Sequence, residues 1–297
     1  MNGTRLTCSI LSVNLEQAQD TEITNILMCI LNSVFCLTAI MGNSVILHVI
    51  RKTPQFHSPS FAFLFCLAAS DLFVGLICQP FFVAFKIAEL GSNFATYCTL
   101  RMIQSLSSWT TSGVSLLILS GVSVDRLLAL TLHLRYNTVV TVPCVFQTTV
   151  CLWIFAIIAV ISRFWINKWI IVPAVILLVS FLVTTLSTLK VFQIARRHQR
   201  QITQQQQQSV QGNAVNFLKC KKSAVTILYV YALFLMFYFP LCVTMFVDSY
   251  IGYTRTVKIA YDYAATVVFL NSSLNPLVYC WRIQAIRRAV NIVIQKN

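Results

Sequence analysis

One carboxylate lies deep inside an apolar stretch of this sequence. Asp71 is the only acid in the otherwise charge-free run Thr53–Phe85, and a charge at the centre of a bilayer costs about 2.5–3.5 kcal/mol or more. Its side chain must therefore face protein or water and find a polar partner. The residues of other apolar runs that offer one are Asn43, Ser115, Asn271 and Asn275. Two roles stay open for Asp71: a protonated acid hydrogen-bonded within a bundle, or a carboxylate in a small hydrated pocket that binds a cation or a proton.

A second group with chemical potential is the adjacent pair Asp125 and Arg126, which follows the apolar run Met102–Val124. The simpler interpretation is a charge pair at a membrane boundary. Neighbouring residues on a helix do not face each other well, so we also expect Arg126 to reach groups on other helices.

Two prolines interrupt later apolar runs. Pro240 lies in the run Ser223–Val247 and Pro276 in the run Tyr263–Trp281. Proline removes a backbone donor and crowds the carbonyl one turn earlier, so it kinks a helix. Packing alone explains such kinks in many membrane bundles. Beside Asp71 and a basic cytoplasmic face, they also indicate helices that can pivot.

These residues belong to a chain with seven long apolar runs. A spanning helix needs about 20 mostly apolar residues, and the need to pair every backbone group in lipid favours helices. The chain is 57% hydrophobic and only 10% charged, whereas soluble proteins carry about 25% charged residues. The sequence therefore predicts an all-α membrane protein, a seven-transmembrane helix bundle. Its spans are Ile23–Ile50, Thr53–Phe85, Met102–Val124, Tyr136–Ser162, Trp169–Leu189, Ser223–Val247 and Tyr263–Trp281.

Basic residues gather on one side of these runs. With the N-terminus outside, the cytoplasmic side carries 15 of the 22 lysines and arginines, and such an excess in short loops marks the cytoplasmic face. We therefore expect a multi-pass cell-membrane protein with an extracellular N-terminus. Its predicted parts are an outer tail over residues 1–22, a membrane domain over 23–281 and a cytoplasmic segment over 282–297. Apolar residues recur at helical spacing in that last segment, which predicts an amphipathic helix on the inner membrane surface.

Charge and cysteine content limit the partners. The net charge of +14 fits an anionic inner leaflet and an acidic cytosolic surface, so we expect membrane lipids but no nucleic acid as partners. Only Cys8 and Cys98 fall on the oxidising outer side, and whether they pair stays open. No cysteine or histidine cluster has metal-binding spacing. Asn2 begins a glycosylation acceptor sequence on the outer tail, which predicts a glycoprotein if the site is used.

In combination, these elements resemble the rhodopsin-like (class A) G protein-coupled receptors over about residues 24–294. Any one element is a weak signal, whereas the whole series in order is specific. The matching elements are Gly42-Asn43-Ser44-Val45, Leu67-Ala68-Ala69-Ser70-Asp71, Asp125-Arg126, Trp153, Phe234, Pro240 and Asn275-Pro276-x-x-Tyr279.

The resemblance implies three sets of functional residues. Coupling to a heterotrimeric G protein would use Asp125, Arg126 and Tyr279, exposed when the inner ends of spans five and six swing outward. No cofactor is expected besides a sodium ion on Asp71, and the switch around it would comprise Asn43, Ser115, Asn271, Asn275, Pro276, Phe234, Tyr238 and Pro240. An extracellular ligand would bind in an aromatic, apolar cavity with few polar anchors, lined by Ser108, Trp109, Ser112, Trp165, Tyr238, Leu241, Met245, Tyr261 and Phe269. Arrestin and a receptor kinase are further partners that the resemblance admits.

Several positions depart from the family's pattern. Leu127 stands where the family has tyrosine, Tyr238 where it has tryptophan, and Arg101 where it has the span-three cysteine. Cys220 replaces an acid that often pairs with the span-three arginine. Receptors for monoamines place an aspartate where this chain has Ser108, so we expect a ligand that is not a monoamine. The short link between the fourth and fifth runs resembles the melanocortin, nucleoside and lipid receptor branch.

Other functions stay open. A seven-helix transporter or channel needs charges at several depths along a polar path, for which Asp71 alone is thin support. The departures at Leu127, Tyr238 and Cys220 also fit an uncoupled or constitutively active receptor-like protein. A retinal photoreceptor is disfavoured because Tyr263–Trp281 contains no lysine. An enzyme is disfavoured because no catalytic constellation recurs within the runs.

Overall fold

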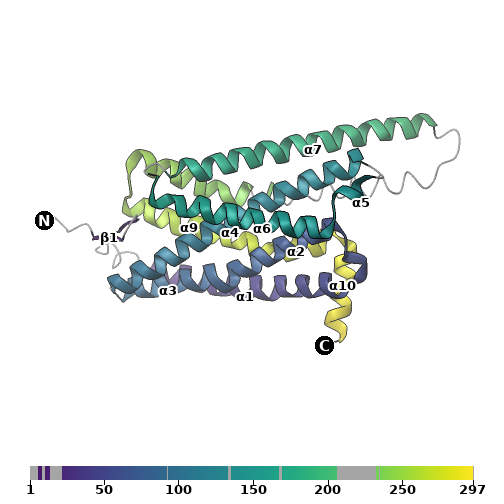
Figure 1. Ribbon diagram of the computed structural model, residues 1–297. Coiled ribbons are helices and arrows are strands. Elements are labelled where there is room, and N and C mark those ends of the chain that lie inside the picture. The colour runs from purple at the N-terminus through teal and green to yellow at the C-terminus, as the bar shows by residue number, and fades with distance from the viewer. Residues whose placement is uncertain are drawn as a thin grey trace.

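The computed structural model describes residues 6–8, 11–13, 22–91, 93–132, 135–166, 169–205, 232–233 and 235–296. Within this part of the chain, seven long helices lie side by side (Figure 1). They are α1 (Glu22–Lys52), the continuous pair α2 (Pro59–Phe73) and α3 (Gln79–Leu90), α4 (Phe94–Leu132), α6 (Val142–Ile161), α7 (Ile171–Gln205), the helix Leu235–Ile251 and α9 (Arg255–Arg282). The predicted all-α, seven-helix bundle is confirmed.

Shorter elements connect and flank these helices. Two strands, β1 (Leu6–Cys8) and β2 (Leu11–Val13), form an antiparallel hairpin within the segment predicted as an outer tail. The hairpin lies at one end of the bundle and the last helix, α10, at the other (Figure 1); we call these the hairpin end and the α10 end. The remaining short elements are η3 (Pro54–Phe56), α5 (Tyr136–Val139), η6 (Ser162–Phe164) and α10 (Gln284–Lys296).

Length and composition suit a membrane. Five helices are long and apolar enough to cross one: Glu22–Lys52, Pro59–Leu90, Phe94–Leu132, Val142–Phe164 and Ile171–Ile194. The described part of the next helix, Leu235–Ile251, is apolar but shorter. Large apolar side chains point away from the bundle, and extended apolar faces of this kind mark contact with lipid. Examples on α1, α6 and α7 are Ile30, Val150, Ile158, Leu178 and Leu186.

The helices extend past the charge-free runs from which the spans were predicted. The α2–α3 helix passes through a π-helical turn at Val74–Cys78 and ends only at Leu90, so it includes Lys86 and Glu89. Likewise α4 begins at Phe94, before Arg101. A charged side chain can remain on a helix within the bundle when an opposite charge meets it there, and the structure supplies such partners.

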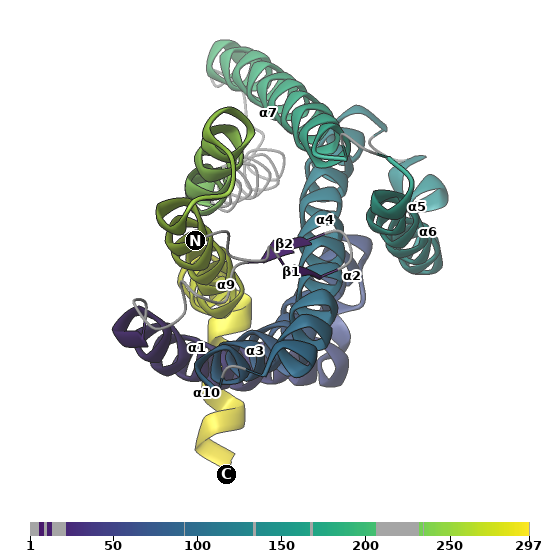
Figure 2. The ribbon, with the colours of Figure 1, turned by 90° about the vertical axis from the view of Figure 1, so that its left-hand side faces the viewer.

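Helix α4 is the centre of the packing. It contacts α2, α3, α6 and α7, while α1 contacts α3 and α9, and the end-on view shows α4 between the α1 side and the α7 side (Figure 2). The predicted amphipathic helix is α10, which packs against α1 and α9. Ile286 of α10 is fully buried in the core, so the apolar face of α10 meets the bundle itself.

Candidate functional site

A cavity of about 630 Å³ opens at the hairpin end of the bundle. Side chains of α3, α4, the η6 link, the helix Leu235–Ile251 and α9 form its wall. Seven of the nine predicted ligand contacts line it: Ser108, Trp109, Ser112, Leu241, Met245, Tyr261 and Phe269. The volume lies within the range of about 300–1,000 Å³ that is usual for small-molecule sites.

Two predicted contacts lie elsewhere. Trp165 is not among the residues of the cavity wall and is 77% exposed, because the η6 link turns its side chain outward after Phe164. Tyr238 is buried deeper, beside a small second cavity of about 60 Å³ that also touches Trp109 and Ser112. Tyr238 therefore lies outside the main cavity wall, next to a second cavity that shares Trp109 and Ser112 with it.

The cavity is more charged than the sequence indicated. Arg101, Arg163, Asp248 and Asp262 all line it, whereas few polar anchors were expected. Arg101 donates to the Tyr253 hydroxyl at 3.5 Å. Burial raises the pKa of Tyr253; Arg101 opposes that rise, and Asp262 adds to it. The phenol is thus held in its neutral form beside the guanidinium.

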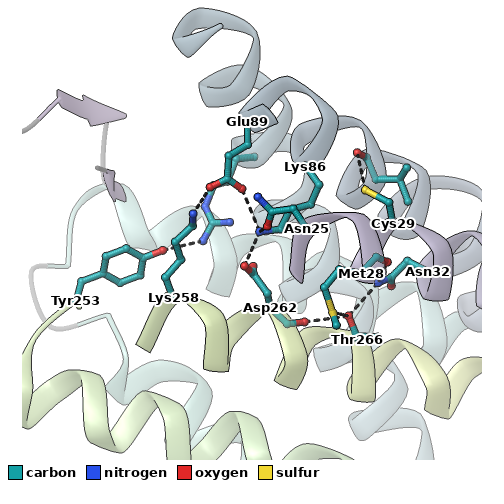
Figure 3. Close-up of polar contacts among 12 residues, drawn as sticks. Asn25, Met28, Cys29, Asn32, Lys86, Glu89, Tyr253, Lys258, Asp262 and Thr266 are labelled. Carbon is teal, nitrogen blue, oxygen red and sulfur yellow. Dashed lines mark hydrogen bonds and ion pairs between the residues drawn. The ribbon is translucent and has the colours of Figure 1, made fainter. Parts of the chain in front are cut away.

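A buried ion cluster lies beside the cavity, and its member Asp262 belongs to the cavity wall. Lys86 donates to Glu89 at 3.1 Å and to Asn25 at 3.0 Å, and it also pairs with Asp262. Lys258 pairs with the other oxygen of Glu89. Figure 3 shows these side chains converging from α1, α3 and α9. The members of the ion cluster, all almost fully buried, are Asn25, Lys86, Glu89, Lys258 and Asp262.

The four charged members of the ion cluster lie outside the charge-free runs, so the sequence did not place them inside the bundle. A signal was nevertheless present in the chain. Lys86 and Glu89 are three residues apart, and Lys258 and Asp262 are four apart, so each pair shares one helix face. Two such pairs at the same depth of a bundle can meet, but only the packing of α3 against α1 and α9 shows that they do.

The mid-bundle site centres on Asp71. Its Oδ2 accepts a hydrogen bond from Asn275 Nδ2 at 2.7 Å, while Oδ1 has no partner among the described residues. Ser115 instead bonds with Ser70, at 2.9 Å. Asn43 donates to the backbone oxygens of Ala39 and Ser272. Of the four candidate partners, only Asn275 bonds directly to the carboxylate, and Asn271 is buried about one turn before it on α9.

The two prolines predicted to belong to the switch make different contacts. Pro276 packs against Gly42, where an added Cβ would come within 2.9 Å of the proline ring, so a glycine is needed for this close approach of α1 and α9. The Pro240 carbonyl accepts a bond from Thr244 at 2.8 Å. Phe234 lies outside the described residues, as does Asn2.

The α10 end carries the Asp125–Arg126 pair. Asp125 is buried and accepts from Tyr136 at 2.6 Å, from Ser60 at 3.1 Å and from the adjacent Arg126 at 3.1 Å. Burial, followed by the bond to Asp125, raises the pKa of Tyr136 to about 12, so this phenol remains a donor. Tyr279 is buried, and its hydroxyl has no partner among the described residues.

In this structure Arg126 folds back onto its neighbour. We expected it to reach other helices because adjacent residues diverge, yet its Nη2 meets Asp125, while its buried Nε has no partner among the described residues. The length of the arginine side chain makes this possible. A guanidinium with unused donors at the end of α4 is available to a further acceptor.

One disulfide is present at the hairpin end. Cys98 of α4 is disulfide-bonded. The eight cysteines Cys29, Cys36, Cys66, Cys78, Cys144, Cys151, Cys242 and Cys280 are free, so its partner is none of these. The side chain of Cys8, the partner considered from the sequence, lies outside the described residues.

Comparison with known proteins adds independent support for the bundle's identity. The sequence pattern of the family described as "7 transmembrane receptor (rhodopsin family)" matches residues 42–173 and 162–279. A trace amine-associated receptor 7d of Rattus norvegicus is 25% identical over 285 residues, which cover 86% of this chain and 78% of the relative. Trace amine-associated receptor 7d of Mus musculus is 23% identical over the same shares.

Proposed function

The chain belongs to the rhodopsin family of seven-transmembrane receptors, and we propose that it is a G protein-coupled receptor whose ligand binds in the cavity at the hairpin end. That cavity carries the proposal, since it gathers polar and aromatic groups from five elements around one space of ligand size. The members of this family are receptors rather than enzymes. A transporter or channel is correspondingly disfavoured.

The proposed orientation has the hairpin end outside the cell. The sequence assigns 15 of its 22 lysines and arginines to the side that would then be cytoplasmic, which is the excess that marks the cytoplasmic face. The α10 helix exposes Arg287 and Arg288, which suits contact with anionic lipid headgroups. An extracellular ligand then enters the cavity directly, and the Asp125–Arg126 pair faces the cytosol.

We propose a ligand other than a simple monoamine. Ser108, at the position where monoamine receptors carry an acid, lines the cavity with a hydroxyl. Of the two acids in the wall, Asp262 is paired with Lys86 and Asp248 accepts the Tyr261 hydroxyl at 3.0 Å. The branch resemblance to melanocortin, nucleoside and lipid receptors stays a prediction beside this.

An amine is the second candidate, and one observation favours it. The relatives described above are named for trace amines, and Asp248 is a cavity acid without a cationic partner among the described ion pairs. The carboxylate of Asp248 can accept an ammonium group beside the bond from Tyr261, because only its Oδ2 is used there. The variant Asp248→Asn therefore separates the two candidates, because it removes amine responses and spares others.

Signalling is proposed to follow a population shift. A ligand that prefers one arrangement of the helices increases the fraction of receptors in that arrangement, and the ends of α7 and the following helix are proposed to swing outward at the α10 end. Arg126 would then exchange Asp125 for an acceptor on the G protein. Arrestin and receptor kinase would use the same exposed face.

The test is a ligand panel in cells with cAMP and calcium readouts, run on wild type and Arg126→Ala. We expect the variant to reach the cell surface and lose G protein signalling. Arg51→Ala, an exposed arginine at the same end, is the matched control and should signal normally. Full agonist-driven signalling by Arg126→Ala contradicts the coupling role. A wild type that binds ligand but activates no G protein indicates the uncoupled alternative.

A further inference from the structure

Two guanidinium groups face the cavity at the hairpin end, and neither forms an ion pair with an acid of the described residues. Arg101 and Arg163 both line it. The hydrogen bond of Arg101 is to the Tyr253 hydroxyl, and that of Arg163 is to the Ser105 hydroxyl at 3.2 Å. Both acceptors are neutral, and no ion pair of the described residues includes either arginine. Each guanidinium is therefore left without a direct carboxylate partner, although Asp262 and Glu89 lie close enough to Arg101 to act on its charge.

The acids near the arginines are already matched by lysines, so the formal charge around the cavity stays positive. In the ion cluster, Lys86 and Lys258 together match Glu89 and Asp262, so the cluster is neutral by itself. Asp248 is the one acid of the wall outside the cluster. The two arginines outnumber it, so the cavity keeps a positive excess even when Asp248 is ionised.

Aromatic rings hold both guanidinium groups in place. Arg101 lies 5.0 Å from the centre of the Phe85 ring, and Arg163 lies 5.0 Å from that of Trp169. Contact with a ring limits the rotation of the planar group and leaves its N–H edges available. Those edges match the two oxygens of a carboxylate, which arginine binds with two parallel hydrogen bonds.

We propose that Arg101 and Arg163 form an anion subsite that binds a carboxylate of the ligand, with the aromatic or apolar body of the ligand against Trp109, Phe164 and Phe269. The inference rests on the proposed function, because it assigns the ligand class of the same cavity. A hydrogen bond to a charged group is worth about 1.5–3 kcal/mol. Loss of either arginine should accordingly weaken carboxylate binding by about tenfold to a hundredfold.

Three probes with one skeleton test the head group. Purified receptor is unfolded thermally with 3-phenylpropionate, 3-phenylpropanamide or 3-phenylpropylamine, and affinity is taken from the concentration dependence of Tm. The carboxylate should stabilise wild type most. Its affinity should fall in Arg101→Gln and in Arg163→Gln. Arg255→Gln, an exposed arginine of α9 that does not line the cavity, should behave as wild type.

Each remaining outcome has a stated meaning. Equal shifts by all three probes, or no shift by the carboxylate at millimolar concentration, overturn the subsite. If the amine gives the largest shift in Tm, and that shift is lost in Asp248→Asn, the cavity is an amine site and the anion subsite is overturned. If Arg101→Gln does not fold, Arg163→Gln and the charge-preserving Arg101→Lys decide.

The assay contains no G protein, so the subsite and the proposed function fail separately. Carboxylate binding to a protein that never signals in cells keeps the subsite and removes the receptor role. If ligands activate both arginine variants as well as they activate wild type, the receptor role stands and the subsite is rejected.

Discussion

Buried acids occur in two regions of this bundle, and their surroundings differ. At the hairpin end, Glu89 and Asp262 are met by two lysines, and Asn25 completes the shell of Lys86. In the middle of the bundle, Asp71 accepts from the Asn275 amide and lies near the Ser272 hydroxyl, but its Oδ1 has no well-formed hydrogen bond among the described residues. Every charge of the ion cluster is therefore paired, whereas the carboxylate of Asp71 keeps one oxygen that can accept a further partner.

The contrast indicates different roles for the two regions. A buried ion pair that loses one partner leaves an uncompensated charge, so a complete cluster favours one arrangement of α1, α3 and α9 strongly. An acid with an open lone pair can be completed by a proton, a water molecule or a cation. We infer that the ion cluster is the fixed frame of the ligand cavity, while Asp71 is the adjustable element.

The largest expected effect comes from breaking the frame. Glu89→Gln removes the acid shared by both lysines and should destabilise the receptor by about 3–5 kcal/mol. Thermal unfolding and surface expression measure it. Replacing all four charged members together with Met and Leu should recover much of the loss, because no charge is left unpaired. A Glu89→Gln receptor as stable as wild type contradicts the fixed-frame role.

The disulfide should be the next contribution at the hairpin end. Cys98→Ser should lower stability by about 2–4 kcal/mol, and reductant should have the same effect on wild type. We predict Cys8 as the partner, so Cys8→Ser should match Cys98→Ser and the double variant should add nothing. Peptide mass spectrometry without reduction identifies the partner. A bridge to any other cysteine would revise the predicted topology.

A moderate effect is expected at the α10 end. Tyr136→Phe removes the 2.6 Å bond to Asp125 and should cost about 1–2 kcal/mol, as for other bonds to a charged group at a partly exposed site. In this variant Asp125 keeps only the bonds from Arg126 and Ser60. Because this changes what holds the Asp125–Arg126 pair, basal signalling should be measured as well as stability. Tyr250→Phe, an exposed tyrosine at the other end, is the control. Unchanged stability and signalling would show that Tyr136 does not restrain the pair.

The smallest change in stability should come from Asp71→Asn. The amide can keep the bond to Asn275 and removes a poorly paired acid, so the variant should lie within about 1 kcal/mol of wild type. If Asp71 binds sodium, which as a hard cation prefers oxygen ligands, Na⁺ should lower agonist affinity in wild type only. Choline at equal ionic strength is the control. Identical salt titrations in both proteins reject the sodium site.

The sequence by itself determined the spans and the mid-bundle acid. Each span is specified locally, because about 20 apolar residues in succession satisfy the thickness of a bilayer whatever the rest of the chain does. Asp71 stands out for the same reason, as a single acid in such a run. The short elements that contain Pro276 and Arg126 could also be identified from the sequence, because each is defined by the spacing of residues along one helix.

Only the tertiary structure decided which charges enter the bundle. Glu89 and Lys258 are 169 residues apart, and a span defined by the absence of charge excludes both of them. Their burial depends on opposite charges arriving from other helices at the same depth, which no local pattern specifies. The same holds for Arg101 and Arg163, whose side chains reach one cavity from two helix ends, and for Trp165, which the turn after Phe164 directs away from it.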